Sequence, residues 1–417
     1  MLVHRETAAF SDTYGGGGNV VGLDCHLVRQ AESPAKRVLV FMHPTGGGMY
    51  LPIVPGLASA GHHVIWANSR YRGTDSALIM EKVVADLGQV IRDARERLGY
   101  EQVVLAGWSG GGSLSAYYQA VANAGDGIAD TPAGDPYVVS PEQLPPADAV
   151  MMLAAHVSRH ETLTEWMDAS ITDETRPFDR DPSLNLYDPA NPNQPPYSPD
   201  FVTTYRAAQQ ARNRRITQWV RGELAALRAA GEPHAERGFV VHGTMADPRW
   251  LDPTLDPSDR APGTCFLGDP QVVNDGPVGL ARFCTLRSWL SQWSLDDARG
   301  DAQRSLPSVT QPVLVVGNTA DDACTPSHTI RLYGAIAHDR KRLHHVEGAT
   351  HYYTGPHGRT HLAEAIDVIG QFLDDELPSA GGGQTPSGQT DAGSRERELL
   401  TGGGLTPSGH IERSCAR

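Results

Sequence analysis

The sequence has no apolar run that approaches the length of a membrane-spanning helix. Residues 1–14 carry acidic and polar side chains where a secretory signal peptide needs an apolar segment. From these two absences we expect a cytoplasmic protein that has no membrane partner.

Cysteine is scarce and widely spaced. The chain has five cysteines, with no CxxC or Cys/His spacing of the kind that ligates zinc. Scattered single thiols suit a reducing compartment. Nothing else in the sequence requires a metal ion or an organic cofactor, so we expect neither.

Positive charge is also scarce, because 35 Lys and Arg stand against 49 Asp and Glu and give a formal charge of −14. Proteins that bind nucleic acid need a basic surface to meet the phosphates. We therefore expect no nucleic-acid partner. A hydrophobic content of 40% and a charged content of 20% are typical of an ordinary globular protein.

The most informative pattern lies at residues 101–121. A short apolar run at 103–106 predicts a buried parallel strand, and the helix formers at 114–122 predict a helix. Between them stands the sequence GWSGG, which has the Gly-x-Ser-x-Gly form of a nucleophile elbow. There Ser109 occupies a tight turn, and the flanking glycines let strand and helix approach closely. A phosphate-binding loop would need a lysine at its helix end, and this segment has none.

Strand and helix patterns alternate on both sides of this stretch. Apolar runs predict strands at 20–28, 37–42, 63–67, 103–106, 148–155, 311–317 and 342–346. Periodicity and end signals predict helices at 51–60, 80–98, 114–122, 326–337 and 362–373. Short connections between alternating elements indicate an α/β fold with a doubly wound, mostly parallel sheet. Ligands bind such sheets at the carboxyl ends of the strands, where Ser109 stands.

The alternation stops between residues 157 and 306, an interval far longer than an ordinary connection. We interpret 157–306 as a helical cap, with helices at 205–230 and 280–290, inserted between late strands of a core formed by 1–156 and 307–378. Most of its tryptophans are expected in the cap's own core, and any that line a pocket favour apolar or aromatic substrates. The Gly-, Ser-, Thr- and Gln-rich residues 379–417 are predicted to be a disordered tail.

A serine hydroxyl needs a base within hydrogen-bond reach, and the base needs a carboxylate that orients it. On this topology both follow later strands, in the order Ser, acid, His. His351, in the loop after the last predicted strand, is the candidate base. Asp321 and Asp322 both follow the preceding strand. We favour Asp322, which stands four residues before Pro326 at the start of the next helix.

The oxyanion formed by nucleophilic attack needs two hydrogen-bond donors. The N–H of Gly110, directly after the serine, is the first. The second is expected from HPTGGG at 43–48, which follows a predicted strand. The proline there has no N–H, so Thr45 or Gly46 supplies the donor, and we favour Thr45.

Two further residues are assigned to the substrate pocket. Trp108 directly precedes Ser109, and His156 ends a predicted strand at the point where the cap begins. His156 could contact the substrate or its leaving group. The alternative is a hydrogen-bonded structural residue at the junction of core and cap.

These motifs together resemble the α/β-hydrolase fold family, in a form with an inserted cap. The resemblance covers roughly residues 36–156 and 307–376, and it is carried by GWSGG, DDACTP, GATH and HPTGGG. Arg72-Gly73 with Ser76 is similar to the family's Arg-Gly-x-Gly-x-Ser segment, except that Asp75 replaces the second glycine. The resemblance implies a Ser-Asp-His triad and an esterase-like reaction without a cofactor.

The favoured function is a serine hydrolase that cleaves a carboxylic ester of a small, apolar or aromatic substrate through an acyl-enzyme. Cleavage of a C–C bond, an amide or a lactone by the same triad is the alternative. A non-catalytic ligand-binding protein on the same fold is a further one. Halide displacement is disfavoured, because it needs a carboxylate where Ser109 stands. The sequence does not indicate an oligomeric state.

Overall fold

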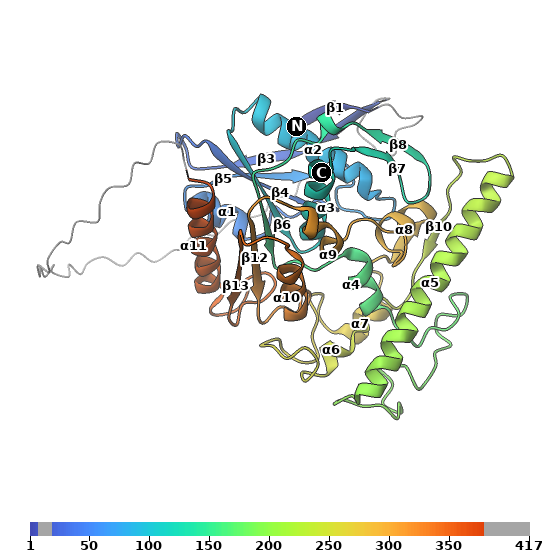
Figure 1. The fold of residues 1–417 in the computed structure, drawn as a ribbon. Coiled ribbons are helices and arrows are strands. Elements are labelled where there is room, and N and C mark those ends of the chain that lie inside the picture. Colours follow the sequence, from blue (N-terminus) through green and yellow to red (C-terminus); the bar gives the residue numbers. More distant parts are fainter. Residues whose placement is uncertain (7–18, 379–417) are drawn as a thin grey trace, which may run out of the picture. The chain divides into compact units, whose positions relative to one another are not determined.

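A computed structural model describes residues 1–6 and 19–378, so the predicted disorder of 379–417 lies outside the described residues. A seven-stranded sheet has the order β13-β12-β9-β6-β4-β5-β3, and its neighbours are parallel except for β3 and β5 (Figure 1). This confirms the predicted mostly parallel α/β sheet. Its strands are β3 (Cys25–Val28), β4 (Arg37–His43), β5 (His63–Asn68), β6 (Gln102–Trp108), β9 (Ala149–Leu153), β12 (Val313–Asn318) and β13 (Lys341–Val346).

Helices cover both faces of the sheet, as the doubly wound prediction required. On one face, α2 (Met80–Glu96), α3 (Gly110–Ala124) and α10 (Pro326–Ala335) bury their apolar residues. On the other, α1 (Ile53–Ser59) and α11 (Gly358–Glu376) do the same. Successive side chains of a strand point to opposite faces, so each central strand contributes to both apolar clusters.

The N-terminal edge of the sheet differs from the prediction of one strand at 20–28. The chain changes direction at Asp24, whose carbonyl oxygen accepts a hydrogen bond of 2.9 Å from the N–H of Asn68. Before it, β2 (Val20–Leu23) pairs with β1 (Leu2–Arg5) in a separate two-stranded sheet. After it, β3 joins the main sheet antiparallel to β5. A small antiparallel pair of strands follows α3 in a region where no strand was predicted, and it consists of β7 (Ile128–Asp130) and β8 (Pro136–Val139).

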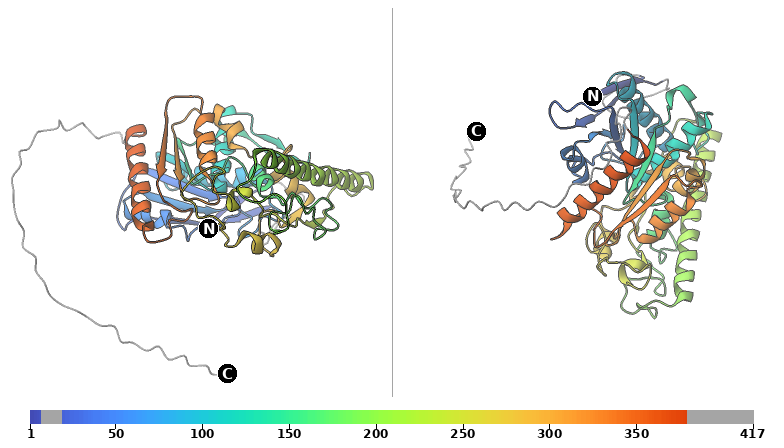
Figure 2. Two further views of the ribbon diagram at one scale, coloured as in Figure 1. Left: turned by 90° about the horizontal axis from the view of Figure 1, so that it is seen from below. Right: turned by 60° about the vertical axis from the view of Figure 1, so that its left-hand side comes forward.

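Residues 157–306, which we name the cap segment, add no strand to the seven-stranded sheet described above. Its long helix α5 lies on the opposite side of the described chain from α11 (Figures 1 and 2). The prediction of one helix at 280–290 is wrong. Residues 283–285 form a short strand that pairs with 238–240, and Thr285 then caps a helix that begins at Leu286. The segment contains α4 (Arg159–Trp166), α5 (Pro199–Ala229), β10 (Gly238–Val240), α6 (Pro248–Leu251), α7 (Pro270–Asp275), β11 (Phe283–Thr285), α8 (Leu286–Gln292) and α9 (Ala302–Ser305).

The cap segment has apolar clusters of its own. Trp289 and Trp293 are fully buried in a cluster to which α5 contributes, and Trp166 and Trp250 belong to a second cluster. Trp219 is 37% exposed. Most of these tryptophans therefore stabilise the segment itself, as the sequence indicated.

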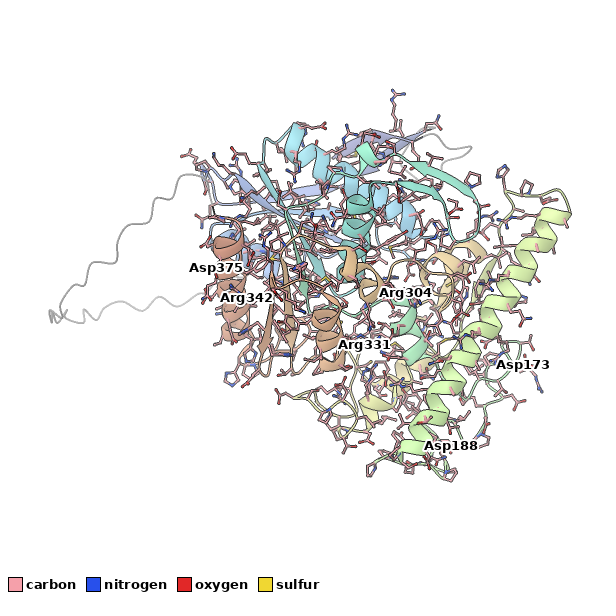
Figure 3. All side chains as sticks on the ribbon, in the orientation of Figure 1. Asp173, Asp188, Arg304, Arg331, Arg342 and Asp375 are labelled. Carbon is pink, nitrogen blue, oxygen red and sulfur yellow. The ribbon has the colours of Figure 1, made fainter. Side chains whose placement is uncertain are left out.

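Figure 3 shows the side chains as sticks and labels six charged ones. Arg342 of β13 pairs with Asp375 of α11 at 2.6 Å. Arg331 of α10 donates to Glu161 of α4 at 2.8 Å, and so links the cap segment to a sheet-covering helix. Among the described residues, none of the helices has the length and apolar character needed to cross a membrane.

Candidate active site

Ser109 lies at the junction between β6 and α3, with a φ of 51° and a ψ of −121°. A positive φ is costly for any residue that has a Cβ, and it persists only where the surroundings impose it. The flanking glycines show what imposes it here. A Cβ on Gly107 would lie 2.4 Å from the carbonyl oxygen of Gly111, and a Cβ on Gly111 would lie 2.6 Å from that of Met42. The backbone geometry is therefore that of the elbow expected from GWSGG.

His351 and Asp321 form a buried pair. The distance from Nδ1 of His351 to Oδ2 of Asp321 is 2.7 Å, and the two residues are 4% and 0% exposed. The other carboxylate oxygen of Asp321 accepts the N–H groups of Ala323 and Cys324 at 2.8 and 2.7 Å. The carboxylate is thus held on both sides, and it orients the ring.

The structure differs here from the preference for Asp322 as the acid. Within the described residues, the side chain of Asp322 makes no hydrogen bond to His351, and its carbonyl oxygen accepts from Nε1 of Trp250 at 2.7 Å. The physical reason is the tight turn after Asp321. The amides of residues 323 and 324 hold the Asp321 carboxylate toward His351, and the side chain of Asp322 lies on a different side of the turn. Burial raises the pKa of Asp322 to about 6, and the neighbouring charge of Asp321 acts in the same direction.

The protonation of His351 reflects the same two carboxylates. Burial opposes protonation, but the charge and hydrogen bond of Asp321, together with the charge of Asp322, raise the pKa of His351 above its usual value. Because Nδ1 faces Asp321, the remaining ring nitrogen, Nε2, is available to take a proton. A base of raised pKa is well suited to accept one from a hydroxyl.

Cys324 joins this pair to the elbow, and sequence reasoning did not single it out. The Ser109 side chain lies close enough to its thiol to act on the thiol pKa, which it lowers. The sulfur also lies within 4.8 Å of a carboxylate oxygen of Asp321 and a ring nitrogen of His351. Burial raises the pKa of the thiol well above its usual value, so it stays neutral. The trio has metal-ligand side chains, but both oxygens of Asp321 are already engaged by hydrogen bonds.

Most of the sequence-predicted site residues line a single cavity of about 470 Å³. Ser109, His351, Thr45, Trp108 and His156 all belong to its wall. Much of the rest of the wall is apolar or aromatic, and the cap segment contributes Trp166, Phe266, Leu267, Val278 and Leu280. The predicted nucleophile, base and pocket residues therefore meet at the same edge of the sheet.

The two N–H groups predicted to bind the oxyanion differ in whether they already have a hydrogen-bond partner. The N–H of Gly110 lies in the first turn of α3, where it has no partner within the helix. The N–H of Thr45 donates to Nδ1 of His43 at 3.3 Å, a long bond that an oxyanion can displace. The N–H of Gly46, the alternative donor, is held by the carbonyl oxygen of His43 at 2.8 Å. Thr45 is therefore the more readily freed of the two.

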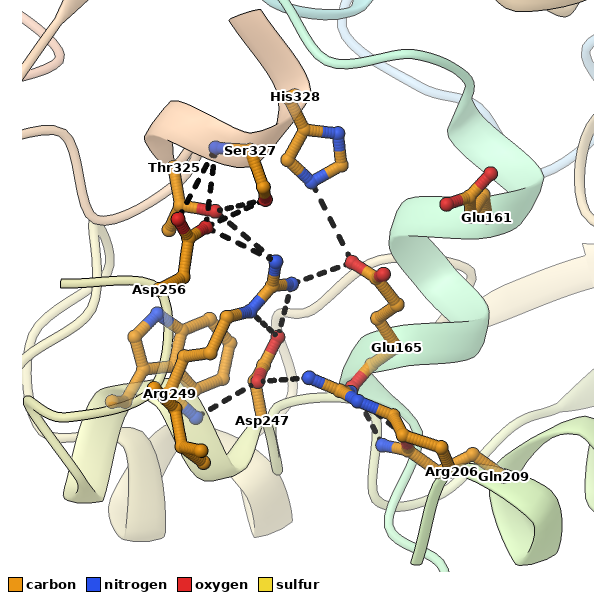
Figure 4. A network of polar contacts seen from close by, with 12 residues as sticks. Glu161, Glu165, Arg206, Gln209, Asp247, Arg249, Asp256, Thr325, Ser327 and His328 are labelled. Atoms are coloured by element: carbon orange, nitrogen blue, oxygen red, sulfur yellow. Dashed lines mark hydrogen bonds and ion pairs between the residues drawn. The ribbon is translucent and has the colours of Figure 1, made fainter. Parts of the chain in front are cut away.

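A buried ionic network ties the cap segment to the turn that carries Asp321 (Figure 4). Arg249 of α6 donates to Asp247 at 2.9 Å and to the hydroxyl of Thr325 at 3.1 Å, and it also pairs with Glu165 of α4. Thr325 immediately precedes α10 and follows the Asp321 turn. The network therefore fixes the acid turn from the cap side.

Replacing Arg249 by methionine is expected to destabilise the protein by about 3–5 kcal/mol at neutral pH. The change removes the guanidinium that the carboxylates of Asp247 and Glu165 share. Arg206 and His328 remain beside them and replace only part of its charge. Burial alone would raise the pKa of Asp247, but Arg206 and Arg249 hold it below its usual value. A depressed carboxyl pKa gives stability that is present above pH 4 or so and lost as the pH falls further. Thermal unfolding should therefore show the largest difference at neutral pH and a smaller one in acid.

Arg214→Met is the matched control for this change. Arg214 pairs with Asp296 at 3.1 Å, with side chains 53% and 42% exposed. Because exposed ion pairs contribute little, the control should cost less than about 1 kcal/mol. Equal losses in the two variants would contradict a structural role for the buried network.

Comparison with known proteins gives one curated relative and many solved structures. The curated relative is the polyketide synthase ThaQ of Burkholderia thailandensis, which is 31% identical over 188 residues. The match covers 40% of this chain and only 9% of that protein. One similar structure is the monoacylglycerol lipase of Paleococcus ferrophilus, with 14% sequence identity and a TM-score of 0.42; the match covers 84% of this chain and 99% of the lipase. Another is Est1E of Butyrivibrio proteoclasticus, with 12% identity and a TM-score of 0.42; this match covers 89% of this chain and 99% of Est1E.

The family described as alpha/beta hydrolase fold matches residues 37–126. This range runs from β4 to just beyond α3, so it includes the Ser109 turn and three adjacent strands of the sheet. The family match and the strand order agree on the architecture. The chain has the α/β-hydrolase fold.

Proposed function

We propose that this chain is a serine hydrolase that cleaves carboxylic esters through an acyl-enzyme. The observation that carries the proposal is the strained Ser109 in one cavity wall with His351, whose ring is hydrogen-bonded to the buried Asp321 at 2.7 Å. A hydroxyl, an imidazole and an orienting carboxylate are the groups that nucleophilic acyl transfer needs. The argument rests on the site, because this fold supports many reactions.

In the first half-reaction, Oγ of Ser109 forms a bond to the carbonyl carbon while its proton moves to Nε2 of His351. The carbonyl electron pair moves onto oxygen, and the N–H groups of Gly110 and Thr45 stabilise the resulting oxyanion. When the intermediate collapses, the bond to the leaving alkoxide breaks and His351 returns the proton to it. Asp321 stabilises the imidazolium throughout.

In the second half-reaction, His351 takes a proton from water, whose oxygen bonds to the acyl carbon. Collapse breaks the bond to Ser109, which recovers its proton from His351. The products are a carboxylic acid and free enzyme. The aromatic and aliphatic wall of the cavity favours an apolar or aromatic substrate.

Mass spectrometry on the acyl-enzyme tests the proposal. Brief incubation with p-nitrophenyl butyrate, quenched in acid and digested, should give a butyryl adduct on the peptide that contains Ser109, together with a burst of p-nitrophenol. A fluorophosphonate should label the same peptide. Cleavage of a diketone without ester turnover would favour the C–C alternative. Absence of any adduct and of any labelling would favour a non-catalytic ligand-binding protein.

A further inference from the structure

Arg159, the first residue of α4, is a buried cation in the wall of the same cavity. It is 5% exposed, and its guanidinium lies 4.3 Å from the ring centre of Trp293. Its Nη2 donates to Asp75 at 3.0 Å and to Gln292 at 3.1 Å. Asp75 is the residue that replaces a glycine of the family's Arg-Gly-x-Gly-x-Ser segment. The ion pair with Arg159 therefore gives a reason for the aspartate at position 75, for which the catalytic triad gives none.

The guanidinium has hydrogen-bonding capacity that this chain does not use. The hydrogen bonds that Arg159 makes within the described residues all come from Nη2, and Nε is buried without a partner. Nη1 lies 3.4 Å from the point where a Cβ on Gly110 would stand, directly beside the nucleophile turn. A buried guanidinium with unused donors is unfavourable unless an acceptor fills the space.

Two imidazoles converge on the same point. Nε2 of His43 lies 2.8 Å from it and Nε2 of His156 lies 3.4 Å from it. Nδ1 of His43 lies 2.9 Å from the hydroxyl of Thr45 and 3.3 Å from its N–H, and with Nδ1 as the acceptor the proton of the neutral ring is on Nε2. His156 is 6% exposed, and its Nδ1 has no hydrogen-bond partner. Sequence reasoning assigned His156 to the pocket but missed His43 and Arg159.

Both rings are neutral near physiological pH. Burial, together with the charges of Arg159 and His351, lowers the pKa of His43 to about 3. Burial, with the nearby His328 and Arg159, holds the pKa of His156 well below its usual value. The corner beside Gly110 therefore presents a guanidinium, which Asp75 pairs with on its far side through Nη2, and two neutral imidazole rings. It suits a singly charged oxygen anion.

We propose that Arg159, His43 and His156 form a carboxylate subsite, so that the substrate carries a carboxylate a few bonds from the reacting carbonyl. This inference rests on the proposed function and narrows it. The carboxylate accepts from Nη1 of Arg159 and from Nε2 of His43, while Asp75 and Gln292 hold the guanidinium from its other side. Gly110 allows these side chains to approach the nucleophile turn, because a Cβ there would lie only 2.8 Å from Nε2 of His43.

The rest of the cavity wall determines the chemical character of the part of the substrate that lies away from the carboxylate. Its wall away from this corner is apolar and aromatic, and it accepts a hydrocarbon or aryl body. The substrate class is therefore an acyl compound with an apolar body and one carboxylate. A monoester of a short dicarboxylic acid is the simplest probe of this class.

The first test measures binding without turnover. In Ser109→Ala protein, the fluorescence of Trp108 and Trp166, both in the cavity wall, should report binding of monoethyl glutarate. Its carboxamide isostere, ethyl 4-carbamoylbutanoate, should bind about 10- to 100-fold more weakly, because it lacks the charge that strengthens hydrogen bonds to Arg159. Equal binding of acid and amide would overturn the subsite. Tighter binding of methyl phosphate than of the acid would overturn its assignment to a carboxylate.

The second test changes the arginine. Arg159→Gln should raise KM for monoethyl glutarate by about 10- to 100-fold more than it raises KM for the amide, and Arg159→Lys should restore part of the preference. Equal loss with both substrates would contradict the proposal and indicate a role in the oxyanion site. If the variants unfold, the acid-against-amide comparison in Ser109→Ala protein decides.

The two proposals fail in different ways. Selective binding of the acid in a protein that hydrolyses no ester would reject the proposed reaction and keep the subsite. Ester turnover with no preference between acid and amide would reject the subsite and keep the reaction.

Discussion

Replacing Ser109 by alanine is expected to lower kcat for ester hydrolysis by about 10⁶-fold while leaving substrate binding close to that of the unchanged protein. The hydroxyl forms the covalent bond, so no other group in the cavity substitutes for it. Steady-state kinetics with p-nitrophenyl butyrate measures the loss. The rate that remains in the Ser109→Ala protein should be the rate enhancement that substrate binding and the oxyanion donors give without a nucleophile.

Ser113→Ala is the matched control, because it removes another buried hydroxyl from the same helix. Ser113 is fully buried, and its hydroxyl donates to the carbonyl oxygen of Gly110 at 3.2 Å. Loss of that bond should cost about 1 kcal/mol of stability and leave kcat within a few fold. Unchanged turnover in the Ser109 variant, or an equal loss in both, would reject covalent catalysis by Ser109.

Most of the fold could be predicted from the sequence, because the apolar runs and glycine positions that define its elements are local patterns. The apolar runs that became β4, β6 and β12 are short and bounded by turn residues, and each is buried in the sheet. The glycines around Ser109 report steric conditions that the structure shows directly. The order of the elements then restricts the sheet to a parallel arrangement, and this brings Ser109 and His351 to one edge.

The unpredicted features depend on contacts between distant parts of the chain. Arg159 and Asp75 are 84 residues apart, and neither carries a local signal for the other. Asp321 and Asp322 are adjacent, and only the path of the turn decides which carboxylate faces His351. Spacing counted back from Pro326 favoured Asp322. The hydrogen bonds from the amides of residues 323 and 324 select Asp321 instead.

Replacing Asp321 by asparagine is expected to lower kcat by about 10⁴-fold, because the amide cannot stabilise the imidazolium and favours the wrong ring tautomer. Asp322→Asn is the matched comparison one residue away, and it should change kcat by less than about tenfold, since its carboxylate makes no hydrogen bond to His351. Steady-state kinetics on both variants measures the contrast. A larger loss from Asp322→Asn would show that Asp322 orients the base in solution.

The pH dependence of kcat/KM gives an independent measure of the same assignment. The active form has neutral His351, so activity falls as the pH drops through the pKa of His351. Against the effect of burial, Asp321 and Asp322 raise that pKa, which places the acid limb above the usual value for histidine. Asp321→Asn should therefore shift the limb to lower pH by the larger amount. Asp322→Asn should shift it less, and it removes the group that titrates at about pH 6. A limb that moves only in the Asp322 variant would contradict the pairing of His351 with Asp321.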